Sequence, residues 1–140
     1  MRWVELLQES TSETLFHKND GKITSFSDLP QGAKNALMAY FEYEEEPLDE
    51  RFGYTLIPIK ELVAACWNAP DNDDMRDYFP DWDTYHHSYW KGERDADYQN
   101  HLAEMWPVIL DDREGILDGW HRLHWYYRNQ VDEVPAILLV

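Results

Sequence analysis

The stretch that most constrains the fold runs from Trp106 to Val140, where short apolar runs alternate with turn residues and a helical pattern. Val108–Leu110 and Gly115–Leu117 lie on either side of a charged segment and predict a β-hairpin. Trp120–Asn129 has helical periodicity, and Val134–Val140 is an apolar run that predicts a closing strand. Together they predict an α+β fold, in which helices pack on a small mixed sheet.

The first half of the chain adds further elements to this core. Asn19-Asp20-Gly21 lies between Thr14–His17 and Lys22–Phe26 and predicts a hairpin with a type I′ turn. Ser27-Asp28-Leu29-Pro30 is typical of a helix start, and the apolar spacing after it predicts a helix to about Tyr43. The remaining expected elements are a strand over Tyr54–Pro58 and helices over Ile59–Trp67 and Ala96–Met105.

Length, aromatic content and charge limit the classes of protein that fit. A chain of 140 residues predicts a single compact domain over residues 1–140. The 7 Trp and 9 Tyr residues supply enough apolar surface to argue against intrinsic disorder. The 28 acidic and 12 basic residues give a net charge of −16, which argues against direct DNA binding because Lys and Arg are the residues that neutralise phosphates. This charge favours a basic partner or mimicry of nucleic-acid charge.

Cysteine usage and hydropathy indicate the compartment. The single Cys66 has no internal disulfide partner, and its apolar neighbours from Val63 to Trp67 predict a buried thiol. No run approaches the roughly 18 apolar residues of a membrane helix, and the N-terminus lacks the pattern of a signal peptide. A reducing cytoplasm without membrane association is therefore the expected location.

The first candidate site is Asp118-Gly119-Trp120-His121-Arg122, where the second hairpin strand passes into the helix. A glycine at such a junction lets a ligand approach the backbone closely, and the first N–H groups of a helix bind anions. His121 and Arg122 on the first turn would add donors or positive charge. The expected ligand-binding residues are Asp118, Gly119, His121 and Arg122.

Several segments resemble, in the same order, elements of the ParB/sulfiredoxin-like superfamily. They are Leu56–Leu62, Leu102–Ile109, Gly115–Gly119, Trp120–Arg128 and Val134–Ile137. The resemblance implies that residues 54–67 and 101–140 form the core of that fold. Residues 1–50 would then be an N-terminal hairpin-and-helix extension, and residues 68–93 would be an acidic, aromatic insertion.

The resemblance also implies a ligand class, because the signature turn binds CTP in ParB proteins and ATP in sulfiredoxins and a related serine kinase. By that likeness Gly119, His121 and Arg122 would contact phosphates of ATP or CTP with Mg²⁺. Trp120 stands where sulfiredoxins have their catalytic cysteine, which excludes sulfinic-acid reduction. His121 replaces one of the paired arginines of ParB proteins, and the chain has no room for their helix-turn-helix DNA-binding part.

Two roles stay open for Asp118. It can cap the helix by accepting from the first N–H groups, or it can hold Mg²⁺ beside a nucleotide, since a carboxylate alone would repel a phosphate. A transition-metal site is a weaker expectation, because Asp118, His121 and His124 are three residues apart but lack further ligands. His124 is expected instead to pack among Trp120, Leu123 and Tyr127.

The second candidate site combines the insertion with the acidic run that precedes Pro47. Aromatic side chains among carboxylates can cover a core as an irregular lid, or they can form an exposed binding surface. The candidate interaction residues are Glu44, Glu45, Glu46, Asp73, Asp74, Tyr78, Trp82 and Trp90. On this hypothesis the protein is a non-enzymatic inhibitor or adaptor that blocks a basic, nucleic-acid-binding protein. In composition it resembles small acidic proteins of phages and mobile elements, including anti-restriction and anti-CRISPR proteins.

A third alternative is purely structural, with a turn that has lost its ligand. A salt bridge between Asp118 and Arg122 would favour it. The sequence contains no P-loop, nucleophile elbow or paired-cysteine metal site, so it predicts no catalytic residues and leaves enzymatic activity open.

Overall fold

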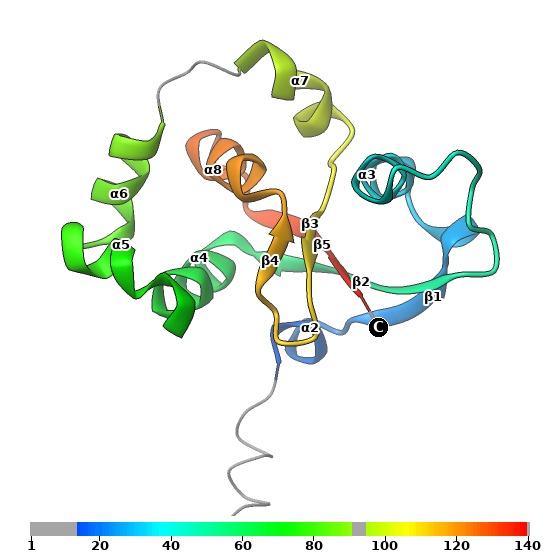
Figure 1. The fold of residues 1–140 in the computed structure, drawn as a ribbon, viewed down its shortest axis with the longest axis horizontal. Coiled ribbons are helices and arrows are strands. Elements are labelled where there is room, and N and C mark those ends of the chain that lie inside the picture. The colour runs from blue at the N-terminus through cyan, green and yellow to red at the C-terminus, as the bar shows by residue number, and fades with distance from the viewer. Residues whose placement is uncertain (1–13, 91–94, 140) are drawn as a thin grey trace, which may run out of the picture.

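The computed structural model describes residues 14–90 and 95–139, and at its centre is a five-stranded mixed sheet (Figure 1). The strand order is β1-β2-β5-β3-β4. β2 pairs with β5 antiparallel, from Gly53 opposite Leu138 to Pro58 opposite Glu133, while β3 runs parallel to β5. The strands are β1 (Lys22–Ser25), β2 (Arg51–Pro58), β3 (Val108–Leu110), β4 (Ile116–Asp118) and β5 (Glu133–Leu138). The predicted α+β class with a small mixed sheet is confirmed.

Helices surround the sheet. They are α2 (Leu15–Lys18), η1 (Phe26–Asp28), α3 (Gln31–Phe41), α4 (Ile59–Asn68), η2 (Pro70–Asn72), α5 (Asp73–Tyr78), α6 (Trp82–Tyr89), α7 (Asp95–Ala103) and α8 (Trp120–Arg128). Among the helices that the structure describes, none has the length and apolar character needed to cross a membrane. The first thirteen residues of the expected N-terminal extension and Val140 of the expected closing strand lie outside the described residues.

The two faces of the sheet support two separate cores, because successive side chains of a strand point to opposite faces. Ile109 of β3 packs with residues of η1 and α3, including Phe26 and Leu37. Its neighbours Val108 and Leu110 pack with residues of α4, α6 and α8 on the other face. Cys66 belongs to this second core, and burial raises the pKa of its thiol to about 12, so the predicted buried thiol is confirmed.

α8 lies between the sheet and α6. Five consecutive residues of the helix, 122–126, are buried, which requires packing on every side. Leu123 packs with the sheet core, while His124 stacks on Trp82 of α6 at a ring-centroid distance of 4.7 Å. A helix with apolar or aromatic side chains on nearly every side is typical of such a position between two layers.

The predicted hairpin around Asn19-Asp20-Gly21 is wrong in its first arm. Thr14–His17 does not form a strand, because Leu15–Lys18 is a short helix capped by the Thr14 side chain, which accepts from the His17 N–H. The backbone N–H groups of Leu15 and Phe16 donate to the carboxylate of Glu114, at 3.0 and 2.9 Å. Only the second arm, β1, is a strand, and it pairs with β2 instead.

The described part of residues 68–93 covers the core, as one alternative expected, but it does so with helices rather than as an irregular lid. These helices are η2, α5 and α6. Arg76 of α5 turns inward, and its Nη1 donates to the carbonyl oxygens of Trp67 and Ala69 at 2.6 and 2.9 Å. These two bonds satisfy carbonyl groups at the end of α4 and tie α5 to it.

Candidate functional site

The turn between β4 and α8 has the strand-to-helix geometry expected from the sequence. Gly119 has φ of 102°, in the left-handed region, and a Cβ added there would lie 3.1 Å from the Cα of Val108. Only glycine meets both conditions without strain. Residues 116–122 line a hollow of about 230 Å³ in front of the turn. All four predicted ligand-binding residues therefore border one hollow.

Arg122, however, directs its guanidinium into the protein. Its side chain is almost entirely buried, and Nη1 donates to the carbonyl oxygen of Pro107 at 2.5 Å. Nε lies 3.4 Å from Nδ1 of His101, and the guanidinium carbon lies 5.4 Å from the centroid of the Trp106 ring. Arg122 thus fastens the segment before β3 to α8, which leaves it few donors for a ligand.

Asp118 does not cap α8, so the first of the two roles left open for it, helix capping, is wrong. Gly119 occupies the N-cap position, and no side chain caps the helix. The carboxylate of Asp118 instead lies 3.8 Å from Nη2 of Arg122. This is the salt bridge that favours a structural role for the turn. A bound phosphate would meet a guanidinium already shared with a carbonyl and a carboxylate.

His121 faces away from Arg122, toward α6. Its Nδ1 lies 3.3 Å from the hydroxyl of Tyr89, and its ring stacks on Trp90. The two predicted cationic or donor side chains of the turn therefore engage different neighbours. The turn joins α8 to two other parts of the fold rather than gathering donors around one point.

A buried histidine pair lies beneath this region. Nδ1 of His86 and Nδ1 of His124 are 2.7 Å apart, and the side chains are 3% and 0% exposed. One ring must donate and the other accept, which requires at least one to be neutral. Burial lowers the pKa of His86 to about 4 and that of His124 to about 3, so both are neutral near pH 7.

The expected packing of His124 is confirmed, since it is fully buried against Trp120 and other aromatic rings. Its partner His86 is 38 residues away, and no spacing in the sequence indicated their contact. Within the described residues there is no group of three or more His, Cys, Asp or Glu side chains that could hold a metal ion.

The candidate interaction residues divide into three groups. Trp82 and Trp90 are only 6% and 8% exposed and belong to the core, so they cannot form part of an exposed surface. Asp73, Asp74 and Tyr78 of α5 are exposed. Glu44, Glu45 and Glu46 are also exposed, but they follow α3 at the other end of the molecule from α5 (Figure 1). The eight residues therefore do not form one surface.

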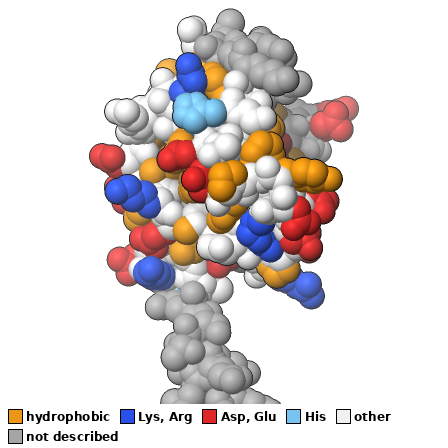
Figure 2. Space-filling view, turned by 90° about the vertical axis from the view of Figure 1, so that its left-hand side faces the viewer, with side chains coloured by type: hydrophobic (Ala, Val, Ile, Leu, Met, Phe, Trp, Pro, Cys, Tyr) orange, Lys and Arg blue, Asp and Glu red, His pale blue; other side chains and the backbone are white. Residues whose placement is uncertain are grey.

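Of the two exposed groups, the more informative one lies on the α5 side, the surface formed by residues 71–83. Tyr78 is 81% exposed, and Asp71, Asp73, Asp74, Asp77, Asp81 and Asp83 around it in the sequence are all exposed. Arg76 is the only basic residue between Asp71 and Asp83, and its guanidinium is turned inward. Figure 2 shows that red carboxylate groups on this side of the molecule lie next to orange apolar groups, with a few blue cationic groups between them.

Comparison with models of protein families, with curated proteins and with solved structures finds no match to this chain. The resemblance of residues 54–67 and 101–140 to the ParB/sulfiredoxin-like superfamily therefore stays a prediction.

Proposed function

We propose that the protein is a non-enzymatic binding module whose α5 side engages a basic, nucleic-acid-binding protein. The observation that carries the proposal is Tyr78, a large aromatic side chain left 81% exposed among carboxylates. A tyrosine supplies contact area with little loss of conformational freedom, and aromatic residues are enriched in the energetically important parts of interfaces. The surrounding carboxylates would meet the Lys and Arg side chains that otherwise neutralise phosphates.

The lack of cationic partners for these carboxylates within the described residues supports this use of the surface. No ion pair within the described part of the chain involves a carboxylate between Asp71 and Asp83. The Asp81 carboxylate caps α6 by accepting from the Thr84 N–H at 2.8 Å, and that of Asp83 accepts from the Tyr127 hydroxyl. The other four keep their negative charge available for a partner, as inhibition by mimicry of nucleic-acid charge requires.

To test this, the protein is immobilised and used to capture proteins from a bacterial lysate. Double-stranded DNA is then added, and the captured proteins that it releases are identified. Binding should be strong at about 0.05 M salt and weak at about 0.5 M, because salt screens exposed charges. The triple variant Asp73→Asn, Asp74→Asn, Asp77→Asn and the uncharged change Tyr78→Ala should each weaken capture of the same protein at least tenfold, the equivalent of ~1.4 kcal/mol.

The matched control is Glu44→Gln, Glu45→Gln, Glu46→Gln, which removes the same number of charges at the other end of the molecule. It should weaken capture far less than the α5 variant does. Equal losses in the two triple variants would mean that net charge alone drives capture, and the proposal would be wrong. Failure of DNA to compete would overturn the proposed class of partner.

The Asp118–Arg122 turn is the second candidate, as a phosphate site for ATP or CTP with Mg²⁺. It is favoured by the hollow in front of Gly119, and the engagement of Arg122 with Pro107 and Asp118 argues against it. Asp118→Asn tests the site, because it should weaken nucleotide binding if Asp118 holds Mg²⁺ and strengthen it if the bare carboxylate repels a phosphate. Calorimetric titration of each nucleotide into wild type and variant measures this. We expect no binding at millimolar concentration in either protein.

A further inference from the structure

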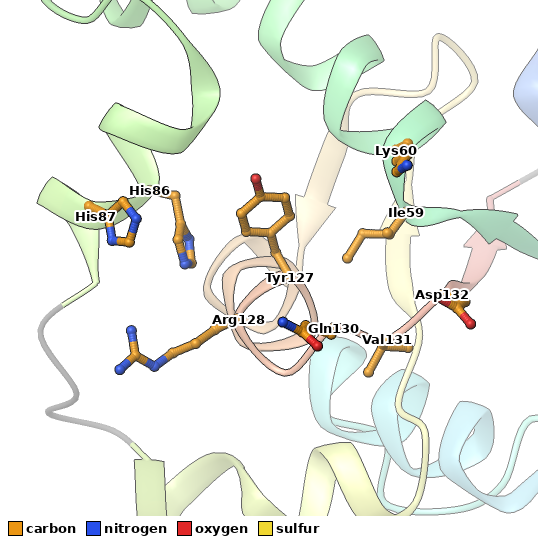
Figure 3. Close-up of a pocket in the computed structure, with 9 residues that line it drawn as sticks. All are labelled: Ile59, Lys60, His86, His87, Tyr127, Arg128, Gln130, Val131 and Asp132. Carbon is orange, nitrogen blue, oxygen red and sulfur yellow. The ribbon is translucent and has the colours of Figure 1, made fainter.

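A groove of about 580 Å³ crosses the C-terminal end of α8, between α6 on one side and the start of α4 on the other (Figure 3). Its volume is in the range of small-molecule sites. Tyr127 stands in the middle of the view, with His86 and His87 of α6 on one side and Ile59 and Lys60 on the other. Neither the turn at Asp118–Arg122 nor the carboxylates of α5 contribute to its lining.

The charge of this groove is opposite to that of the chain as a whole. Lys60 and Arg128 both line it, whereas Asp132 is the only acidic residue among the described residues that line it. Neither Lys60 nor Arg128 forms an ion pair with a carboxylate in the described part of the chain. In a protein with 28 acidic and 12 basic residues, two cations that share a groove without carboxylate partners favour an anionic ligand.

Both ends of the groove have a further feature that suits an anion. The guanidinium of Arg128 lies 5.1 Å from the centroid of the Trp90 ring, which holds this cation at the α6 end of the groove. At the other end Lys60 belongs to the first turn of α4, a ten-residue helix whose N-terminus has no side-chain cap. The helix dipole there adds to the positive potential, although the Ile59 N–H already donates to the carbonyl oxygen of Asp132 and the first turn also contains Glu61.

The middle of the groove is apolar. Ile59, Tyr127 and Val131 line it, and the ring of His86, almost fully buried, contributes a neutral aromatic surface. The hydroxyl of Tyr127 donates to Asp83, which holds the phenol ring in place. An inorganic anion would leave these apolar walls in contact with water, whereas a ligand with an apolar body would cover them.

We propose that this groove binds a small organic anion, a carboxylate or sulfonate on an aromatic or aliphatic body. The anionic group contacts Arg128 or Lys60, and the body covers Ile59, Tyr127 and Val131. This site is independent of the proposed protein-binding surface on α5.

Three probes separate charge from apolar contact. Naphthalene sulfonate has both properties, naphthalene methanol has only the apolar body, and inorganic sulfate has only the charge. Each is titrated into the full-length protein labelled with ¹⁵N, and amide shifts locate the site. We expect naphthalene sulfonate to move amides at Ile59, Tyr127 and Val131 and to bind at least tenfold more tightly than the other two probes, the loss expected for one charge-assisted contact.

The variant Lys60→Gln, Arg128→Gln should lower the affinity for naphthalene sulfonate at least tenfold, measured by the same titration. The matched control Lys22→Gln, Arg113→Gln removes the same charge at exposed positions outside the groove and should change affinity less than twofold. Equal effects of the two variants would overturn the proposal, as would equal affinity for the neutral probe. Shifts confined to residues 116–122 would assign the anion to the α8 turn and also overturn it.

Discussion

The two faces of the sheet are covered by layers of different chemistry. On the α3 side the buried residues are apolar, with Phe26, Leu37 and Ile109 fully enclosed. On the other side the layer between α6 and α8 is made of indole, imidazole and phenol rings, including the stacked rings of Trp82, His86 and His124.

This difference separates two ways of stabilising a helix on a sheet. Apolar burial on the α3 side has no direction and does not depend on pH. The layer under α6 contains polar atoms that have to be satisfied, and in the described residues Nε1 of Trp82 and Nε2 of His124 have no hydrogen-bond partner. Such atoms reduce the net gain from burying the rings. We therefore expect α6 to be released before α3 when the protein is destabilised.

The largest expected effect is on the apolar side. Phe26→Ala should lower the free energy of unfolding by about 3–5 kcal/mol, because it leaves a cavity beneath η1. Urea unfolding followed by circular dichroism measures the loss at pH 7.5 and again at pH 5.0. The loss should be the same at both pH values, since the buried residues of this core cluster are all apolar. A loss that changes with pH would break the distinction between the two layers.

The second effect is a loss of stability on the α6 side as the pH falls. The folded state holds the pKa of His86 near 4 and that of His124 near 3, below the ordinary value of 6.5. Between these pH values the unfolded chain binds more protons than the folded protein does. The contribution of the two histidines to the free energy of unfolding is therefore fully present above pH 6.5 and decreases as the pH falls toward 4. The slope should reach at most ~1.4 kcal/mol per pH unit for each histidine.

Urea unfolding at pH 7.5, 6.5, 5.5 and 5.0 tests this slope, since carboxylates contribute mainly below that range. His86→Gln, His124→Gln should be less stable at pH 7.5 but should have a flatter pH dependence. His17→Asn, at an exposed position, is the control and should leave the slope unchanged. If the double variant keeps the slope of wild type, the buried pair does not cause it.

A third, smaller effect concerns Gly119, the residue at which the chain passes from the sheet into α8. Gly119→Ala should lower the free energy of unfolding by about 1–2 kcal/mol, the typical penalty for a residue with a Cβ in the left-handed region. Gly115→Ala is the matched control, because Gly115 does not have a left-handed φ and a Cβ there would lie nearest to the Asp111 carboxylate, at 3.3 Å. Thermal unfolding compares the two variants. Equal losses would mean that the conformation of Gly119 is not the cause.

The smallest effect is expected on the surface, away from both layers. Glu44→Gln, Glu45→Gln, Glu46→Gln should change the free energy of unfolding by no more than about 0.5 kcal/mol, with a slight gain because like charges are removed. The gain should decrease in high salt. If urea unfolding shows a loss of more than about 1 kcal/mol, this loop makes stabilising contacts outside both layers.

The elements that the sequence predicted well are those whose pattern is local. Val108–Leu110, the helix from Trp120 and the closing apolar strand all depend on periodicity within a few residues, and all are present. The first arm of the N-terminal hairpin was predicted wrongly because its backbone partner is the carboxylate of Glu114. No local pattern contains that information.

The candidate sites divide in the same way. The position of the turn could be predicted, because a glycine between a strand and a helix is a local signal. The direction of Arg122 depends on the carbonyl of Pro107, and the pairing of His86 depends on a helix 38 residues farther on. Lys60 and Arg128 share a groove although their separation in the sequence gives no indication of it. Side-chain direction and tertiary contact were therefore the parts that only the structure could supply.

The carboxylate of Glu114 makes α2 depend on the far end of the chain. A helix of 4 residues is too short to be stable alone, and its first N–H groups donate to a side chain 98 and 99 residues later. During synthesis the ribosome must deliver the turn between β3 and β4 before α2 has this partner. The segment that is made first among these elements is therefore among the last to settle.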